Sequence, residues 1–186
     1  MKGDRLGSIV LALLVTASWG PQGAKPVSGS PERPAAVTAA DSTELIAAYA
    51  RRYRISPALA RTIYVQAREV GVEPGLAFGL AATESRFNPR AVGRSGERGL
   101  LQLKLATARA YDRRVRPEEL FHPETNVRLG LLHLKREAEH FDHDWRLGLL
   151  AYNMGRGRLQ RALARGFVPR TGYATRVLAH LREQPL

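Results

Sequence analysis

The sequence predicts a mainly α-helical protein. From residue 41 onward, apolar residues recur three and four positions apart, and no stretch shows the alternation of a half-buried strand. Serine, aspartate or threonine precedes most of the apolar stretches, and proline or glycine separates them, as at the starts and ends of helices. The chain has 186 residues, of which 44% are hydrophobic, and this suits one compact domain with a short extra segment.

The first 40 residues are predicted to lie outside this domain. Residues 1–17 combine Lys2 and Arg5 with an apolar run, residues 9–15, that is too short to span a bilayer. Small residues up to Ala17 favour a cleaved signal peptide, with an uncleaved anchor or a buried helix as the alternatives. We therefore expect a periplasmic protein without stable membrane insertion after cleavage, which sequencing of the mature N-terminus would test.

The next segment, residues 18–40, is rich in proline, glycine, serine and alanine and has few large apolar residues. Such a segment cannot bury a core, so we expect a flexible linker. The folded domain is then residues 41–186.

Three helices are expected in the first half of that domain. The first should begin near Asp41 or Ser42, where Glu44 completes a capping pattern. The pair Ser56–Pro57 starts the second helix, and Gly71 ends it. The third starts at Glu73–Pro74 and must end before Pro89, because a residue that precedes proline avoids helical geometry.

The second half is predicted to hold a loop and three further helices. Residues 90–99 are polar and contain three glycines, so they read as a loop. A long amphipathic helix follows, with Val127, Leu131, Leu134, Ala138 and Phe141 on its apolar face. Asp144 can cap the next helix, which runs to Gly155. Thr171 can cap the last one, whose apolar face is made of Tyr173, Val177 and Leu181.

One carboxylate continues the apolar face of the third helix. Leu76, Leu80 and Glu84 are four residues apart and share one helix face. Burial disfavours the charged form of a carboxylate and raises its pKa, so Glu84 can stay protonated and act as a general acid. The alternative is an ordinary glutamate at a helix end whose head group reaches solvent.

The composition limits the classes of partner that this protein is expected to bind. The formal net charge of +12, carried mostly by arginine, favours a polyanion, which can be nucleic acid, an acidic membrane surface or an acidic wall polymer. A nucleic-acid binder would need arginines clustered on a recognition helix and gains nothing from export, so no nucleic-acid partner is expected. The chain has no cysteine, and His140 and His143 have no supporting third ligand, so we expect no metal and no cofactor.

Several motifs in order resemble the soluble lytic transglycosylase family. The first contains Glu84 and is followed by a glycine-rich stretch that ends near Gln102; a later one reads Ala-Tyr-Asn-Met-Gly-Arg-Gly. The resemblance runs from about residue 58 to about residue 180. It implies a lysozyme-like helical domain with a substrate groove. The matching segments are residues 84–89, 96–103, 126–130, 141–144, 151–157 and 171–177.

The resemblance implies that Glu84 is the single general acid and base. It would cleave the β-1,4 bond between N-acetylmuramic acid (MurNAc) and N-acetylglucosamine (GlcNAc) in peptidoglycan and leave a 1,6-anhydroMurNAc end. The implied partners are peptidoglycan glycan strands and cell-envelope machinery, and we expect a monomer.

The resemblance also implies substrate-binding residues. Gln102 matches a glutamine that lines the groove in that family. Tyr152 would either donate a hydrogen bond from its hydroxyl group near the scissile bond or pack in the core. Asn153 contacts substrate or, more simply, loop backbone. Tyr173 belongs to the groove wall or to the core. Lys104 stands where the family usually has methionine, and it would bind a substrate carboxylate or lower the pKa of Glu84.

Two other functions remain open at this stage. A muramidase would hydrolyse the same bond with Glu97 or another carboxylate as its second group, although Glu97 reads as a solvated loop charge. A non-catalytic wall-binding protein would retain the fold, but intact Glu84, Gln102 and Tyr152 argue against it.

Overall fold

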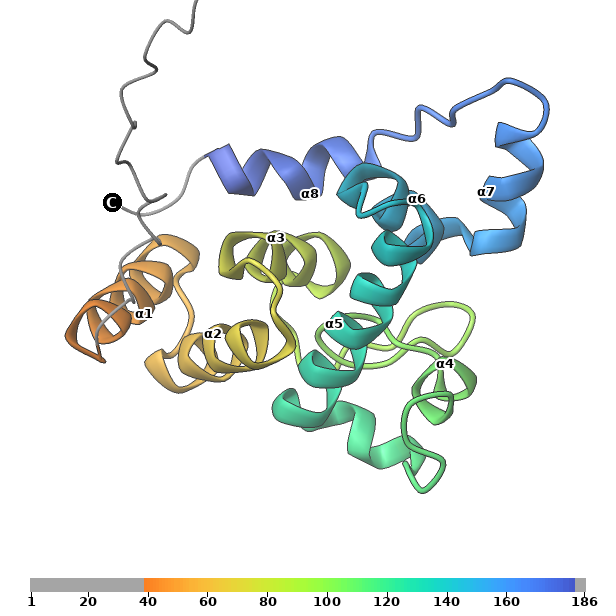
Figure 1. Cartoon of the computed structure of the whole chain (residues 1–186). Coiled ribbons are helices and arrows are strands. Elements are labelled where there is room, and N and C mark those ends of the chain that lie inside the picture. The colour runs from red at the N-terminus through yellow and green to blue at the C-terminus, as the bar shows by residue number, and fades with distance from the viewer. Residues whose placement is uncertain (1–38, 183–186) are drawn as a thin grey trace, which may run out of the picture. The chain divides into compact units, whose positions relative to one another are not determined.

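A computed structural model describes residues 39–182 as a bundle of helices with one long loop over residues 86–104 (Figure 1). The predicted signal peptide, and the linker as far as residue 38, lie outside the described residues and stay predictions. No described helix is long and apolar enough to cross a membrane. In chain order the elements are α1 (Ala39–Tyr53), α2 (Pro57–Val70), α3 (Pro74–Ser85), α4 (Leu105–Arg109), the 3-10 helix η1 (Pro117–Phe121), α5 (Pro123–His140), α6 (Trp145–Met154), α7 (Arg156–Leu163) and α8 (Tyr173–Arg182).

The predicted caps of α2 and α6 are confirmed, whereas Asp41, the predicted first cap, lies inside α1. The Ser56 side chain accepts a hydrogen bond from the backbone N–H of Leu59, and Gly71 ends α2 in the left-handed conformation. Asp144 caps α6 in the same way as Ser56 caps α2, through the N–H of Leu147. Helix α1 begins at Ala39, two residues before the predicted start at Asp41, so the last two residues of the predicted linker are helical.

Helix α3 is buried on all sides over its first eight residues, which extends the burial beyond the one face that Leu76 and Leu80 share. Every residue from Pro74 to Ala81 is buried. Figure 1 shows α3 between α2 and α8, and α8 packs closely against it. A Cβ atom on Gly79 would lie 2.5 Å from the carbonyl oxygen of Val177 in α8, so a glycine is what allows this approach.

Aromatic rings fill the space between α1 and α3. The rings of Tyr49 and Phe78 stack with their centroids 4.0 Å apart, and the ring of Tyr53 lies 5.5 Å from that of Phe78. Parallel aromatic packing of this kind adds to the free energy gained from burial alone. The N-terminal helix is therefore part of the same core as α3.

Three short elements were not predicted. Helices α4 and α7 and the 3-10 helix η1 span five to eight residues each, too few to show a hydrophobic period. Around α4 and η1, a second small core forms from Leu103, Ala108, Val115, Leu120 and Leu129. This core supports the segment that follows the glycine-rich loop.

We predict that Gly79→Ala destabilises the protein, because the new methyl group meets backbone atoms of α8 that cannot move aside. Overpacking of this kind costs about 1–3 kcal/mol of unfolding free energy. Thermal unfolding followed by circular dichroism measures it. The matched control is Gly157→Ala in α7, where a Cβ would meet no atom closer than 3.5 Å; an equal loss of stability in both variants would contradict the close packing of α3 on α8.

Candidate active site

A groove of about 560 Å³ opens beside the C-terminal end of α3. It is bordered by the loop after α3, by α4 and α5, by the end of α6 and by the first residue of α7. Five of the six site residues predicted from the sequence line it, and Tyr173 is the exception. The lining residues are Glu84, Glu97, Gln102, Leu103, Lys104, Thr107, His133, Glu137, Ala151, Tyr152, Asn153, Met154, Gly155 and Arg156.

Glu84 occupies the last turn of α3, where the buried helix reaches the groove. Burial raises the pKa of Glu84, a hydrogen bond from Tyr173 lowers it, and the nearby charge of Glu97 raises it further. The net shift is upward, as the sequence predicted. A larger fraction of this side chain is therefore protonated at neutral pH than in an ordinary glutamate.

Tyr173 lies behind the groove and not on its wall. Its side chain is buried, and its hydroxyl group donates a hydrogen bond to Oε1 of Glu84 across 89 residues of sequence. A donor at this position stabilises the ionised form of Glu84 and fixes the direction of its carboxyl group. Tyr173 is therefore a positioning residue, a role that the sequence did not reveal.

The loop on the other side of the groove is held by Asn126, a fully buried residue of α5. Its side chain accepts a hydrogen bond from the N–H of Leu101 and donates to the carbonyl oxygens of Arg98 and Leu120. Gly99 packs so closely against this amide that a Cβ would collide with it. This role of Asn126 was not predicted, although a polar residue beside the apolar face of a long helix was a signal for it.

Gln102 lies at the end of that loop, with a left-handed backbone conformation. Its amide nitrogen donates to the carbonyl oxygens of Ala91 and Gly99, at 3.3 and 3.0 Å. Its amide oxygen has no hydrogen-bond partner among the described residues, so this oxygen can accept a hydrogen bond from a ligand in the groove.

Tyr152 and Asn153 end α6 at the groove. The hydroxyl group of Tyr152 donates to the carbonyl oxygen of Leu101 at 2.6 Å, so its proton already has a protein acceptor. The hydroxyl group can still accept a hydrogen bond, and the ring forms part of the groove wall. Asn153 is exposed on the groove, and no hydrogen bond from it to loop backbone occurs within residues 39–182.

Glu97 and Lys104 form an ion pair at the groove, 3.3 Å apart. The expectation that Glu97 is a solvated loop charge is therefore wrong, since it is half-buried and lines the groove. Its Oε2 accepts a hydrogen bond from the backbone N–H of Ser95, and the net effect of its contacts holds the pKa of Glu97 below its usual range. Lys104 binds Glu97, so the alternative in which it lowers the pKa of Glu84 is not what the structure shows.

His140 and His143, for which no metal site was expected, lie at the polar corner where α5 ends. Over residues 39–182, no three histidine, aspartate or glutamate side chains are grouped so that they could hold an ion. At this corner, the ring of His140 instead meets the Gln160 side chain at 2.8 Å.

Fold and groove together define a lysozyme-like helical domain in which a glutamic acid of raised pKa faces the groove. The chain belongs to the Transglycosylase SLT domain family, which it matches over residues 61–167.

Individual relatives agree with this membership. A peptidoglycan transglycosylase, gp16 of Escherichia phage T7, is 37% identical over 92 residues, which are 48% of this chain and 7% of the phage protein. The 70-kDa soluble lytic transglycosylase of Escherichia coli is 25% identical and superposes with a TM-score of 0.59, over 64% of this chain and 23% of its own. The lytic transglycosylase Slt of Pseudomonas aeruginosa, solved as an inactive mutant, is also 25% identical, with a TM-score of 0.58 over 64% and 22% of the two chains. This chain therefore spans less than a quarter of each of these relatives.

We predict that Tyr173→Phe reduces the rate of glycan cleavage by about 10-fold or more, because Glu84 loses the donor that stabilises its ionised form. The same change raises the pKa of Glu84. The limb of the pH–rate profile on which activity falls as Glu84 deprotonates therefore moves to higher pH. Cleavage of purified peptidoglycan at several pH values measures both effects.

The control is Tyr64→Phe, which removes a buried phenol hydroxyl from α2, away from the groove. It should change neither the rate nor the profile. A Tyr173→Phe enzyme with an unchanged pH profile would show that the hydrogen bond to Glu84 has no part in the reaction.

Proposed function

We propose that this domain is a lytic transglycosylase that cleaves the β-1,4 bond between MurNAc and GlcNAc in peptidoglycan and forms a 1,6-anhydroMurNAc end. One observation carries the proposal. Three carboxylates line the groove, and their surroundings raise the pKa of Glu84 but lower those of Glu97 and Glu137. Of these three, only Glu84 is suited to donate a proton at neutral pH. Membership of the Transglycosylase SLT domain family supports the same reaction.

In the first step, Glu84 protonates the glycosidic oxygen, and the bond from that oxygen to C1 of MurNAc breaks. A second carboxylate is not required, because the C2 acetamide of the same sugar can bond to C1 through its oxygen. This gives an oxazolinium ion and the free GlcNAc-ended strand. The hydroxyl group of Tyr173 stabilises the glutamate that results.

In the second step, ionised Glu84 takes the proton of the C6 hydroxyl group. The O6 atom bonds to C1 as the acetamide oxygen leaves, and the acetamide is restored. No water is consumed, and Glu84 is protonated again. Gln102 and Asn153 would bind the sugars through their amides, Tyr152 would form part of the groove wall, and Lys104 would bind a substrate carboxylate.

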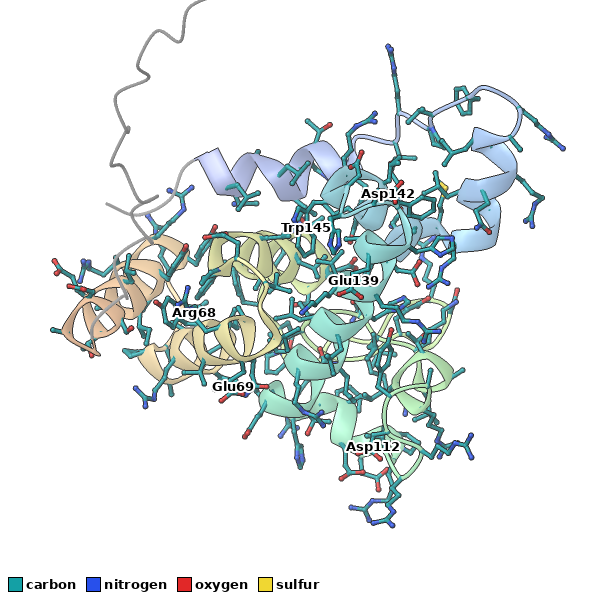
Figure 2. The ribbon with its side chains drawn as sticks, viewed as in Figure 1. Arg68, Glu69, Asp112, Glu139, Asp142 and Trp145 are labelled. Carbon is teal, nitrogen blue, oxygen red and sulfur yellow. The ribbon has the colours of Figure 1, made fainter. Side chains whose placement is uncertain are left out.

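We predict that Glu84→Gln lowers cleavage of purified sacculi by about 10²–10⁴-fold while the thermal midpoint changes little, because glutamine keeps the shape but donates no such proton. The wild-type products, analysed by mass spectrometry, should lack one water relative to hydrolysis products. The matched control is Glu139→Gln on the exposed face of α5, labelled in Figure 2, which removes the same charge outside the groove. Glu84→Gln activity within a few-fold of wild type would refute the assignment.

Hydrolysis is the second candidate, and the position of Glu97 favours it. Glu97 lines the same groove as Glu84 and is held ionised, as a base for water must be. Against this role, its two oxygens already accept from the N–H of Ser95 and pair with Lys104.

We therefore expect Glu97→Ala to keep activity within about 10-fold of wild type and to keep 1,6-anhydro products. Its charge raises the pKa of Glu84, so its removal should move the Glu84 limb of the pH–rate profile to lower pH. Wild-type products that carry the added water, together with an inactive Glu97→Ala enzyme, would establish a muramidase instead.

A further inference from the structure

The groove contains a second polar cluster that the proposed reaction does not use. Arg156, the first residue of α7, donates from Nε to Oε2 of Glu137 at 2.9 Å and from Nη2 to Oε1 at 2.8 Å. Both residues line the groove. Two parallel hydrogen bonds of this kind fix the plane of the guanidinium group as well as its position.

The two partners of this ion pair are unequally exposed. The Glu137 side chain is 5% exposed, and that of Arg156 is 30% exposed. The negative charge is thus covered by protein, whereas part of the cation faces the groove. A guanidinium group has five N–H donors, and Glu137 takes two of them, so donors remain for a ligand.

Glu137 is itself held in place from α5. Its Oε1 lies 3.6 Å from Nδ1 of His133, and this nitrogen lies 3.2 Å from the hydroxyl group of Tyr111. Burial lowers the pKa of His133, the charge of Glu137 raises it, and the charge of Arg156 lowers it; the net shift is downward, which favours the neutral imidazole at neutral pH. The positive charge beside Glu137 is therefore chiefly that of Arg156.

An arginine fixed in this way loses little conformational freedom when a ligand arrives. Lys104, the other cation of the groove, has a flexible stem, and its side chain is 54% exposed. Arg156 is the better candidate for directional recognition, because its planar fork matches the geometry of a carboxylate.

We propose that Arg156 binds a carboxylate of the glycan strand and so makes the groove selective for strands that carry one. The inference rests on the proposed function, in which the ligand is peptidoglycan. Carboxylates in that polymer come from two sources: the stem peptide, and the lactyl group of MurNAc where the peptide is missing. Oligomers of GlcNAc carry neither.

The test uses Glu84→Gln protein, which should bind strands without cutting them. Its affinity is measured by calorimetry for three ligands of equal length: a GlcNAc oligomer, a peptide-free GlcNAc–MurNAc oligomer and a peptide-bearing one. Adding Arg156→Gln should weaken binding of carboxylate-bearing strands by about 10–100-fold, the effect of losing a charge-assisted hydrogen bond. Binding of the GlcNAc oligomer should not change. A loss with the peptide-free MurNAc oligomer alone identifies the lactyl carboxylate, and a loss with the peptide-bearing strand alone identifies the peptide. A loss with both shows that Arg156 binds a carboxylate from either source.

Two further variants serve as controls for this experiment. Arg156→Gln leaves Glu137 buried without its partner, so the double variant Glu137→Gln/Arg156→Gln, which removes both charges, should show the same selective loss in a folded protein. Arg158→Gln removes an exposed arginine of the same helix, outside the groove, and should bind all three ligands as before.

Two outcomes overturn the proposal. One is equal affinity of the Glu84→Gln protein for charged and uncharged oligomers; the other is an equal loss for all three ligands when Arg156 is replaced. Failure of the proposed function is distinct from both, because it is read from the cleavage products of the wild-type enzyme. Carboxylate-selective binding without cleavage would leave the Arg156 site standing.

Discussion

The burial of α3 from Pro74 to Ala81 is the constraint on which the site depends. A helix that contacts protein on every side cannot shift or rotate without disturbing α2 and α8 together. Gly75, Ala77, Gly79 and Ala81 keep it thin enough for these neighbours to approach. Glu84 comes one turn after the buried stretch, at the point where protein gives way to the groove. Its pKa is raised for this reason, and the same packing fixes its position.

Neighbouring groups then give three carboxylates of one groove three different roles. Burial raises the pKa of Glu84, and its carboxyl group accepts a hydrogen bond from the neutral phenol of Tyr173. Glu97 is ionised because backbone N–H groups and Lys104 stabilise its charge. Glu137 is the most buried of the three, and burial acts to raise its pKa, but the hydrogen bonds from Arg156 and the nearby positive charges together lower it further than burial raises it. The chemistry that each carboxylate can perform thus follows from its partners and not from residue type.

The groove is formed by residues from several helices and from the loop after α3. Asn126 joins the loop after α3 to α5 through two hydrogen bonds and binds η1 through a third, and the loop in turn places Gln102 and Glu97. Buried side-chain amides of this kind specify one loop conformation, because any other arrangement leaves polar atoms without partners. The carbonyl oxygen of Leu101 in the same loop accepts a hydrogen bond from the hydroxyl group of Tyr152, so the two sides of the groove are joined to each other.

The sequence by itself determined the longer helices, several of their caps, and Glu84 as the candidate acid. These features depend on neighbours within about four residues. The hydrophobic periodicity and the capping residues Ser56 and Asp144 can therefore be recognised in the sequence. Only the tertiary structure decided which groups meet: Tyr173 with Glu84, Lys104 with Glu97, and Arg156 with Glu137. Short elements such as α7 escaped prediction because eight residues show too little periodicity. The long-range pairs could not be predicted, because the spacing of residues along the sequence does not show which distant side chains will meet. A side chain meets a partner 89 residues away only when the packing of whole helices brings the two together.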